Sequence, residues 1–587
     1  MTASGLSWCA CFIRVPLPDV SGYVEQRGKV RYFYAYVGPR LRTRSGRSTH
    51  PSARMIGRVE ADPSGKDELM PNTFYYELMK LPLPSEAVAE GAGRKPAPKG
   101  RPATERGEGS EMSMGYGLAS AALAEETGLL GAMQEALGTR DACKLLGLAA
   151  FLADGAHSSL SKLNSFIGDN FPFLADASFD SRLAGDLLVR LDPQARSAFY
   201  KAWNRVQAPA ARQIFYDVTS FSTYSGKIRK ASFGYNRDGE DLPQINEGLF
   251  CCRETGMPLF MCSYNGSLND ASNFSHALGL ARACQLKPAR RGLVMIMDGG
   301  FSSDSFSWLH LGGWKFIGGV SPSRIKPVRE AFLKWAHEVS DDVEGRMWEA
   351  GGHPYVSGRI PFTLGGVDGA LLICRDIDSR AAMMDSLSKR KAAKRAELDG
   401  CRRCPGSGFD AWAASFRPFF IVEKARNSKG FKYSEDVEGF KERVALAGKA
   451  VLFTTCTDMA DQEIMEAYRS KESVEDCFDT TKNGLCDGRL HIQGDAQADG
   501  KLFAMFVALI LWRTIHSRIK GWLKKNNATV EDAIEVLKQI KYVKIEGKWK
   551  MKDALAKSQR ELLQDLKLDL SFMDGTDKAT HTLGAAS

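Results

Sequence analysis

The chain of 587 residues lacks the features that mark secreted and membrane proteins. Its first residues do not form a charged and apolar leader. Its longest apolar run, Leu502 to Trp512, is far shorter than the roughly 18–20 residues that a membrane span requires. Its thirteen cysteines are scattered and odd in number, which favours reduced thiols over a disulfide framework. We therefore expect a cytoplasmic protein with no membrane partner.

Three widespread catalytic motifs are also absent from the sequence: the phosphate-binding loop GxxxxGK[ST], the zinc-protease helix HExxH and the nucleophile elbow GxSxG. The nine histidines form no pair at helical spacing. Cys401 and Cys404 have the spacing of half a zinc site, but no second CxxC or histidine pair stands nearby. The sequence therefore gives no support to nucleotide hydrolysis by a P-loop, to zinc chemistry or to serine hydrolysis.

What the chain does have is ample apolar material and a mildly basic charge. Hydrophobic residues make up 44% of the sequence, and the length corresponds to roughly three to five domains of typical size. The net charge of +9 permits a polyanionic partner without requiring one.

Shifts in composition and periodicity divide the chain into six segments. These are a basic N-terminal region with a Gly- and Pro-rich linker (1–110), a helical domain (111–205), the first part of an α/β core (206–321), a β-rich insertion (322–445), the second part of the core (446–530), and a helical and basic tail (531–587). DNA binding and plain scaffolding are both open as roles for the helical domain.

Two stretches are rich in basic residues. The segment "PRLRTRSGRSTHPSARMIGRVE" interleaves arginine with Ser, Thr and Gly, which suits contact with phosphate groups. The segment "SLSKRKAAKRAELDGCRRC" predicts a strongly basic helix. A solvated loop explains the first stretch equally well. If the stretches do bind phosphate, the DNA-contact residues are Arg40, Arg42, Arg44, Lys389, Arg390 and Lys394.

The pattern after residue 206 predicts a mixed sheet covered by helices. We expect three strands, a helix, a strand, a second helix and a fifth strand. The first strand should end near Asp217, and a buried strand should stop at Asp298. The expected elements lie in "RQIFYDVTSFS", "KASFGYNRDG", "GLFCCRETGMPLFMCSYNG", "NDASNFSHALGLARAC", "RGLVMIMDGG" and "WKFIGGVSP".

Asp217 and Asp298 thus fall at strand ends, where ligands of such sheets bind. Either alone could be a turn residue. Together with Glu475 on a later helix, they form a set of three carboxylates. Such a set repels itself unless a cation neutralises it, and hard oxygen ligands select Mg²⁺ or Mn²⁺. We expect the three carboxylates to converge on one metal-sized space.

The helix that carries Glu475 has a distinctive edge. At about 100° per residue, Tyr468, Lys471, Glu475 and Lys482 fall within roughly 60° of one another, and Asn483-Gly484 then ends the helix. An ordinary amphipathic helix with a charged rim accounts for this pattern as well.

The segments "FYDVTSFS", "VMIMDGGF" and "YRSKESVEDCFDTTKNGL" resemble the three signature blocks of DDE transposases of bacterial insertion sequences. More narrowly, the last block resembles the group with the signature Y-(2)-R-(3)-E-(6)-K, which falls here on Tyr468, Lys471, Glu475 and Lys482. Lys471 stands where arginine is usual, so the charge is kept but the bidentate fork is lost. The resemblance runs from about residue 210 to residue 530.

This resemblance implies a ribonuclease-H-like mixed sheet with helices on both faces, interrupted by the β-rich insertion. It also implies DNA cleavage and strand transfer with two Mg²⁺ or Mn²⁺ ions. Asp217 would bridge the two ions, Asp298 would hold one and Glu475 the other. Tyr468, Lys471 and Lys482 would contact DNA phosphates.

The partners implied are double-stranded DNA, both the terminal inverted repeats and the target, and a second copy of the chain in a synaptic complex. The location implied is the bacterial nucleoid. A flipped base would stack on an aromatic residue of the insertion, with Trp335, Trp348 and Trp412 as alternatives. Two other functions remain open: a ribonuclease-H-like nuclease such as a resolvase, and an inactive relic that only binds DNA ends.

Overall fold

The computed structural model describes residues 15–568 except 28–29, 37–40, 43–47, 50–52, 62–65, 72, 82–107, 156–158, 172–178, 237, 288–292, 302, 339–346, 402, 406, 426–429, 486–488, 493 and 547. The chain forms two compact units, Met1–Pro102 and Ala103–Ser587. Arg40 and Arg44 lie outside the described residues, and Arg42 ends the short strand β4 (Leu41–Arg42). Their assignment to DNA contact stays a prediction.

The N-terminal unit is built on a small sheet with the strand order β1-β7-β6-β3-β2. Successive side chains of a strand point to opposite faces of the sheet. Phe33, Ala35 and Leu69 pack on one buried face, together with Tyr75 and Tyr76 of the helix α1 that follows β7. The elements are β1 (Val15–Pro16), β2 (Gly22–Arg27), β3 (Val30–Tyr36), β6 (Ala53–Ala61), β7 (Asp67–Pro71) and α1 (Thr73–Met79).

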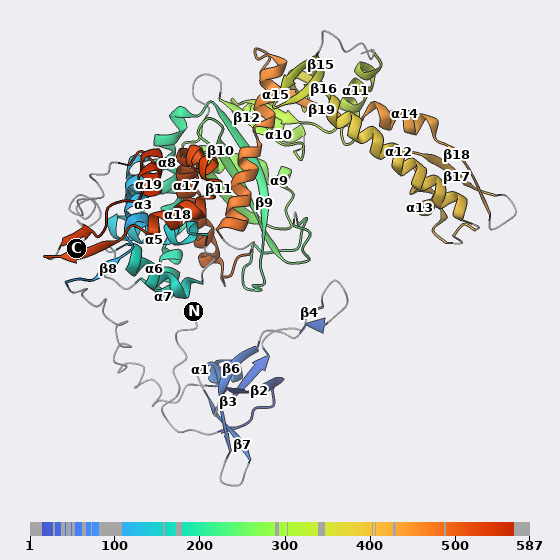
Figure 1. The fold of residues 1–587 in the computed structure, drawn as a ribbon. Coiled ribbons are helices and arrows are strands. Elements are labelled where there is room, and N and C mark those ends of the chain that lie inside the picture. Colours follow the sequence, from blue (N-terminus) through green and yellow to red (C-terminus); the bar gives the residue numbers. More distant parts are fainter. Residues whose placement is uncertain are drawn as a thin grey trace. The chain divides into compact units, whose positions relative to one another are not determined.

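The second unit contains a nine-stranded mixed sheet with the order β11-β10-β9-β12-β13-β19-β16-β15-β14 (Figure 1). Strands β9, β10 and β11 are antiparallel, whereas β12 runs parallel to β9, and β13 runs parallel to β12. The prediction of a mixed α/β fold with a large mixed sheet is confirmed. The strands are β9 (Gln213–Ser222), β10 (Gln244–Cys252), β11 (Pro258–Asn265), β12 (Val294–Met297), β13 (Lys315–Gly319), β14 (Met347–Ala350), β15 (His353–Leu364), β16 (Val367–Asp376) and β19 (Lys449–Thr454).

Two strands lie elsewhere than the sequence pattern predicted. The segment "KASFGYNRDG" is not a strand; it makes a single bridge, between Ser232 and Gln244. The segment "GLFCCRETGMPLFMCSYNG" instead contains most of β10 and all of β11, because the chain turns back at Gly256, whose φ of +68° suits glycine. The predicted number of strands, five from β9 to β13, was correct. The turn at Gly256, inside the segment predicted to be one strand, was missed.

Helices cover both faces of this sheet. On one face, the ring of Tyr216 lies 5.0 Å from that of Phe274, on helix α9 (Asp270–Ala283). On the other, Phe221 packs with Met505 of helix α17 (Asp495–Asn526). Among the described residues, α17 is the one helix long and apolar enough to cross a membrane, and 78% of its most apolar window is buried inside the protein. The apolar run from Leu502 is thus part of the core.

Apart from the short strand β8, the described part of residues 111–205 is mostly helical, as the periodicity predicted, but its helices do not form a separate core. They share one hydrophobic core with α17 and with the C-terminal segment. Strand β20 (Tyr542–Ile545) pairs with β8 (Glu111–Met112), which ties the tail to the start of this region. The helices are α3 (Gly115–Glu126), α4 (Leu129–Leu137), α5 (Thr139–Ala153), α6 (Leu163–Asn170), α7 (Ser181–Arg190), α8 (Pro193–Gln207), α18 (Val530–Lys538) and α19 (Lys557–Asp565).

The segment expected to be a β-rich insertion has mixed structure. Its strands β14, β15 and β16 do not form a sheet of their own, because β16 pairs with β19 and so extends the main sheet. The 24-residue helix α12 (Ile377–Gly400) then leads toward α13, β17 and β18 (Figure 1). A small apolar cluster forms there around Phe416 and Phe420. The remaining elements are α11 (Lys326–Glu338), α13 (Phe409–Ala414), β17 (Phe420–Lys424), β18 (Phe431–Glu435) and α14 (Val437–Ala445).

Candidate active site

Asp217 and Asp298 are brought side by side by the pairing of β9 with β12. The parallel register places Met297 opposite Tyr216, so the next residue of each strand is one of the two aspartates. Asp298 follows the last residue of β12, as predicted. Asp217 lies in the middle of β9 rather than near its end, because β9 continues to pair with β10 as far as Ser222. The carboxylates thus meet where β12 ends and β9 is left without a neighbour on that side.

The helix expected to span residues 468–482 is interrupted. Helix α15 (Asp461–Arg469) ends before Ser470, helix α16 (Glu472–Asp479) follows, and a π-helical turn, η5 (Thr480–Gly484), completes the segment. The hydroxyl of Ser470 donates to the carbonyl of Ala467 at 2.8 Å and accepts from Nε of Arg253 at 2.6 Å. Such side-chain bonding to the preceding turn bends helices, which accounts for the break.

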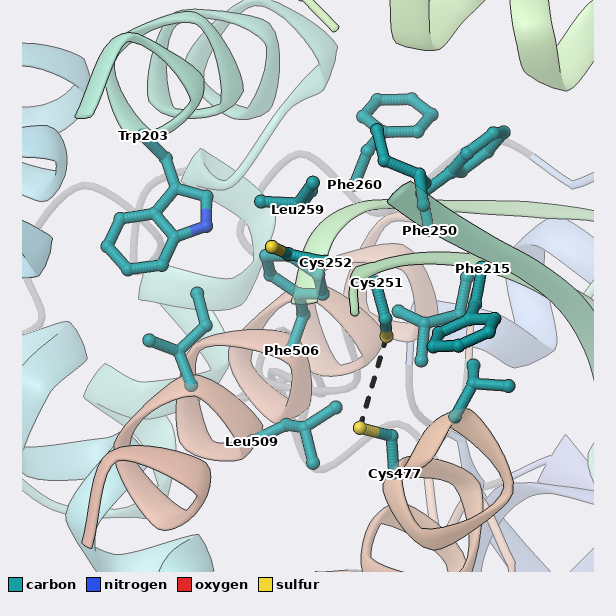
Figure 2. Close-up of a cluster of buried hydrophobic side chains, with 14 of the residues drawn as sticks. Trp203, Phe215, Phe250, Cys251, Cys252, Leu259, Phe260, Cys477, Phe506 and Leu509 are labelled. Atoms are coloured by element: carbon teal, nitrogen blue, oxygen red, sulfur yellow. Dashed lines mark hydrogen bonds between the residues drawn. The ribbon is translucent and has the colours of Figure 1, made fainter. Parts of the chain in front are cut away.

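Helix α16 is held on the sheet by a buried contact around Cys477. Its sulfur lies 3.9 Å from that of Cys251 on β10, and both side chains are fully buried. Figure 2 shows the two thiols directed toward each other beside Phe215 of β9. The described cysteines are all free, so this contact is a packing contact between thiols. It places Glu475, two residues before Cys477, on the same side of the sheet as Asp217.

Tyr468 and Lys471 both contact Asp298 across the gap between helix and sheet. The Tyr468 hydroxyl donates to Oδ1 of Asp298 at 2.8 Å. Nζ of Lys471 lies 3.2 Å from the same oxygen and 3.3 Å from Oε1 of Glu475. The ammonium group therefore links the second and third carboxylates of the set.

The charges of this site shift its pKa values in a consistent way. Burial acts to raise the pKa of Asp298, but Lys471, the Gly299 amide and Tyr468 together hold it below its ordinary value. Burial acts to lower the pKa of Lys471, yet Asp298 and Glu475 raise it. Asp298 and Lys471 therefore face each other as carboxylate and ammonium at neutral pH.

The pKa of the Tyr468 hydroxyl is affected by burial and by all three carboxylates. Burial raises its pKa, and the negative charges of Asp298, Asp217 and Glu475 raise it further. The hydroxyl also fits closely against the end of β13, because a Cβ added to Gly319 would lie 2.6 Å from the phenolic oxygen. Tyr468 is therefore a fixed hydrogen-bond donor and not a phenolate.

The three carboxylates are of a type that suits a divalent cation, but the described side chains do not gather around one metal-sized space. Within the described ranges, no group of three or more His, Cys, Asp or Glu side chains is close enough to hold a metal ion. A cation does lie among the carboxylates, and it is the Lys471 ammonium. Carboxylate oxygens from two strands and a helix are the ligands that Mg²⁺ and Mn²⁺ prefer. These residue types suit such an ion, and the ammonium of Lys471 stands between two of them.

Comparisons with known proteins find a likeness among solved structures. No family model matches the sequence, and no curated protein matches it. Among solved structures, the chain is similar to a piggyBac transposase in a synaptic complex with hairpin DNA, with 11% identity and a TM-score of 0.30, over 79% of this chain and 75% of that one.

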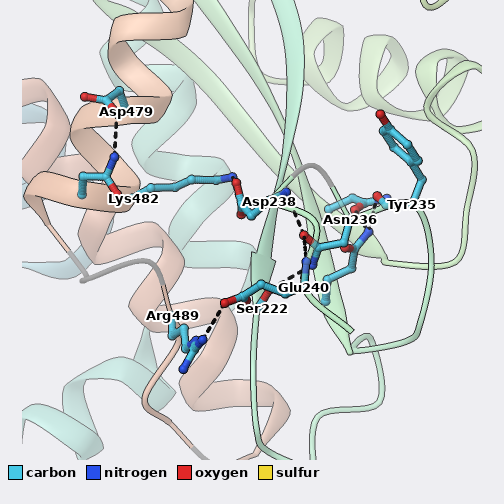
Figure 3. Close-up of polar contacts among 11 residues, drawn as sticks. Ser222, Tyr235, Asn236, Asp238, Glu240, Asp479, Lys482 and Arg489 are labelled. Carbon is cyan, nitrogen blue, oxygen red and sulfur yellow. Dashed lines mark hydrogen bonds and ion pairs between the residues drawn. The ribbon is translucent and has the colours of Figure 1, made fainter. Parts of the chain in front are cut away.

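Lys482 is the last of the four residues that were expected along one edge of the helix, and it lies apart from the other three. It sits on η5, and its ammonium contacts Oδ2 of Asp238 at 2.7 Å (Figure 3). Asp238 belongs to the connection between β9 and β10. This acidic partner was not expected from the sequence, because the surrounding segment was predicted to be a strand.

The basic residues of α12 are engaged within their own subdomain. Lys389 pairs with Asp385 at 2.6 Å and remains 76% exposed. Arg390 lies over the ring of Phe419, and Lys394 over the ring of Phe416 while pairing with Glu397. These contacts account for much of the charge of α12 without a ligand, and DNA contact by these residues stays a prediction.

Each of the three tryptophans considered as stacking platforms for a flipped base already contacts another side chain of the protein. Trp335 is 7% exposed and lies under the guanidinium of Arg375. Trp348 stacks on Tyr355 with ring centroids 5.1 Å apart. Trp412 packs edge-on against Phe416. Each ring therefore has a structural role in its own part of the chain.

Proposed function

We propose that this protein is a transposase that cleaves DNA at the ends of an insertion sequence and transfers the ends to a target, in a metal-dependent reaction. One observation carries the proposal: Asp217 and Asp298 are adjacent on parallel strands, and Lys471 links Asp298 to Glu475. Carboxylates from three distant parts of the chain are thus linked pairwise, Asp217 to Asp298 by the strand register and Asp298 to Glu475 by Lys471, and they follow one another in the order of the transposase motif.

The sheet supports the finer assignment to a ribonuclease-H-like core. In sequence order, the five strands β9 to β13 are arranged 3-2-1-4-5, with the first three antiparallel and the next two parallel to the first. This is the arrangement that the resemblance to DDE transposases leads us to expect. It is a topological argument, independent of the sequence motifs.

In this mechanism, Asp217, Asp298 and Glu475 would hold the Mg²⁺ or Mn²⁺ ions. Bound there, such ions lower the pKa of an attacking water or 3′-hydroxyl and stabilise the leaving oxygen. Lys471 would leave its position between Asp298 and Glu475 and turn its ammonium to the phosphate of the cleaved strand. The acids must be ionised to act as ligands, and the Gly299 amide and the Tyr468 hydroxyl, which both lower the pKa of Asp298, would remain beside it after Lys471 leaves.

Tyr468 would act as a donor and not as a nucleophile. Its raised pKa keeps the hydroxyl protonated, and its bond to Asp298 fixes the orientation of that carboxylate. No covalent bond between protein and DNA is needed, since water and the 3′-hydroxyl are the nucleophiles. The proposed partners are the terminal repeats, a target duplex and a second copy of the chain.

The test is to incubate the purified protein with its flanking element DNA and Mg²⁺ and to sequence the ends produced. We expect specific cleavage at the element ends and joining to target DNA. Asp217→Asn, Asp298→Asn and Glu475→Gln should each abolish cleavage while DNA-end binding persists. Full cleavage by any of the three would refute the assignment.

The same experiment separates the alternatives. Cleavage at branched or damaged DNA without any preference for the element ends would indicate another ribonuclease-H-like nuclease. Binding to the ends with no cleavage by the wild-type chain, in either Mg²⁺ or Mn²⁺, would indicate an inactive relic.

A further inference from the structure

We propose that Asp238 and Glu240 form an acidic latch that occupies two phosphate-binding positions beside the candidate active site. The latch would neutralise Lys482 and Arg489 until a DNA backbone displaces it. This inference rests on the proposed DNA-processing function and adds a competition between the chain's own carboxylates and DNA phosphates.

The latch consists of two ion pairs between segments far apart in the chain. Nζ of Lys482 lies 2.8 Å from one carboxylate oxygen of Asp238 and 2.7 Å from the other. Nη2 of Arg489 lies 2.5 Å from Oε1 of Glu240. Both acids belong to the connection between β9 and β10, whereas both cations follow the helix that carries Glu475. A carboxylate with two oxygens on an ammonium or guanidinium mimics the way these groups bind phosphate.

The latch is presented by a defined turn. Oδ1 of Asn236 accepts from the backbone amide of Asp238 at 2.8 Å and from that of Glu240 at 3.4 Å. The side-chain amide of Asn236 donates to the hydroxyl of Ser222, the last residue of β9, at 3.0 Å. Figure 3 shows the two acids directed from this turn toward the two cations. The acids are therefore held in place by the turn as well as by their partners.

The position of the latch relates it to the carboxylate site. The four latch residues line a pocket of about 640 Å³ that also includes Thr219. Thr219 is two residues beyond Asp217 on β9, so both side chains lie on the same face of the sheet. Lys482 lies on the turn that continues α16, beyond Glu475. A DNA strand with one phosphate at the carboxylates would place neighbouring phosphates along this pocket.

The exposure of the four side chains makes displacement feasible. Lys482 is only 12% exposed, but Asp238 is 39% exposed, and Arg489 and Glu240 are 34% and 29% exposed. Ion pairs in contact with water contribute little net stability. A polyanion gains in addition from the release of its counterions. The latch is thus weak enough to yield to a duplex.

The test compares two double variants with the same change in net charge. Asp238→Asn with Glu240→Gln removes the latch. Asp458→Asn with Glu561→Gln is the matched control, because these acids pair with Lys315 and Lys525 at 2.9 Å and do not line the latch pocket. The probe is a fluorescein-labelled DNA duplex of arbitrary sequence, and the affinity is measured by anisotropy at several salt concentrations without divalent cations.

We expect the latch variant to bind the duplex about tenfold more tightly than the control variant. The slope of log Kd against log salt concentration should steepen by about two, because two more cations contact phosphates. Adding Lys482→Gln and Arg489→Gln to the latch variant should remove both effects. Each single latch substitution is measured too, so the test does not depend on the folding of the double variant.

Equal affinity and equal slope for the latch and control variants would overturn the latch. A lower melting temperature without any gain in affinity would show that Asp238 and Glu240 only fasten the turn. Either result leaves the proposed function intact as long as the wild-type chain cleaves element ends. If wild-type and variants all fail to bind the duplex, the latch is overturned, and the DNA-processing function is refuted only if the wild-type chain also leaves element ends uncleaved.

Discussion

The hydroxyl of Tyr468 lies 2.8 Å from the carboxylate of Asp298, although 170 positions separate the two residues in the chain. This bond joins helix α15 to the end of strand β12. It also places a neutral donor, in addition to the Lys471 ammonium, on the aspartate that the site depends on. Close packing around Tyr468 and the charges of the neighbouring side chains determine how the site should respond to substitution.

Gly319 should be required for the position of Tyr468. A Cβ at this position would lie 2.6 Å from the Tyr468 hydroxyl and 2.8 Å from the amide nitrogen of Gly299, so Gly319→Ala must displace one of them. We expect cleavage by Gly319→Ala to fall by about tenfold or more, which corresponds to about 1.4 kcal/mol of activation free energy. The measurement is single-turnover cleavage.

Tyr468→Phe is the matched variant, because it removes the hydroxyl and with it the closer of the two clashes, while the contact with the Gly299 backbone remains. If the Tyr468 position explains the effect, adding Gly319→Ala to Tyr468→Phe should cost much less than it does in the wild-type chain. An equal cost in both backgrounds would place the effect of Gly319 elsewhere.

Lys471 should compete with divalent cations for Asp298 and Glu475. Removing its charge by Lys471→Gln leaves two carboxylates without their counter-ion, so the variant should be less stable than wild type in the absence of metal. Its melting temperature should then rise more on addition of Mn²⁺, because binding to the folded state stabilises it. The measurement is thermal unfolding over a Mn²⁺ titration.

Lys389→Gln is a suitable control for that experiment, since Lys389 also pairs with an acid four residues away, in an exposed position on α12. Its response to Mn²⁺ should equal that of wild type. A Lys471→Gln variant with the wild-type response would show that the ammonium does not occupy a metal position.

Glu247 should make the stability of the core depend on pH. It is fully buried on β10, neither of its oxygens has a hydrogen-bond partner in the described part of the chain, and burial raises its pKa from 4.5 to about 8. Lys230, Arg196 and Asp499 are the charged groups that act on it. Between these two pKa values the folded state holds a proton that the unfolded state has lost.

The free energy of unfolding should therefore fall as pH rises from about 4.5 to about 8, by at most about 1.4 kcal/mol per pH unit, and level off above. Glu247→Gln cannot ionise, so its stability should not show this fall and should exceed that of wild type at alkaline pH. Urea unfolding midpoints at pH values within and above the window provide the measurement. Parallel pH profiles for the two chains would contradict the assignment.

Much of the fold could be predicted from local patterns. The buried strand Val294–Met297, the strand Lys315–Gly319 and the helix Asp270–Ala283 were expected from their apolar runs and from the Asn269 cap. Such signals depend on a few neighbouring residues, so one sequence is sufficient to read them. The strand assigned to residues 230–239 was wrong because turn residues alone do not distinguish a strand from a long connection.

In the candidate site, too, some features could be predicted from the sequence and others depended on the tertiary structure. The sequence by itself determined which residues are available: two aspartates at strands, a glutamate on a helix, and a tyrosine and lysines at helical spacing from it. Only the tertiary structure decided that the register of β9 and β12 makes the aspartates neighbours, that Ser470 interrupts the helix, and that Lys482 pairs with Asp238 rather than joining Lys471. Registers and ion pairs depend on which distant segments meet, and that depends on the packing of the whole unit.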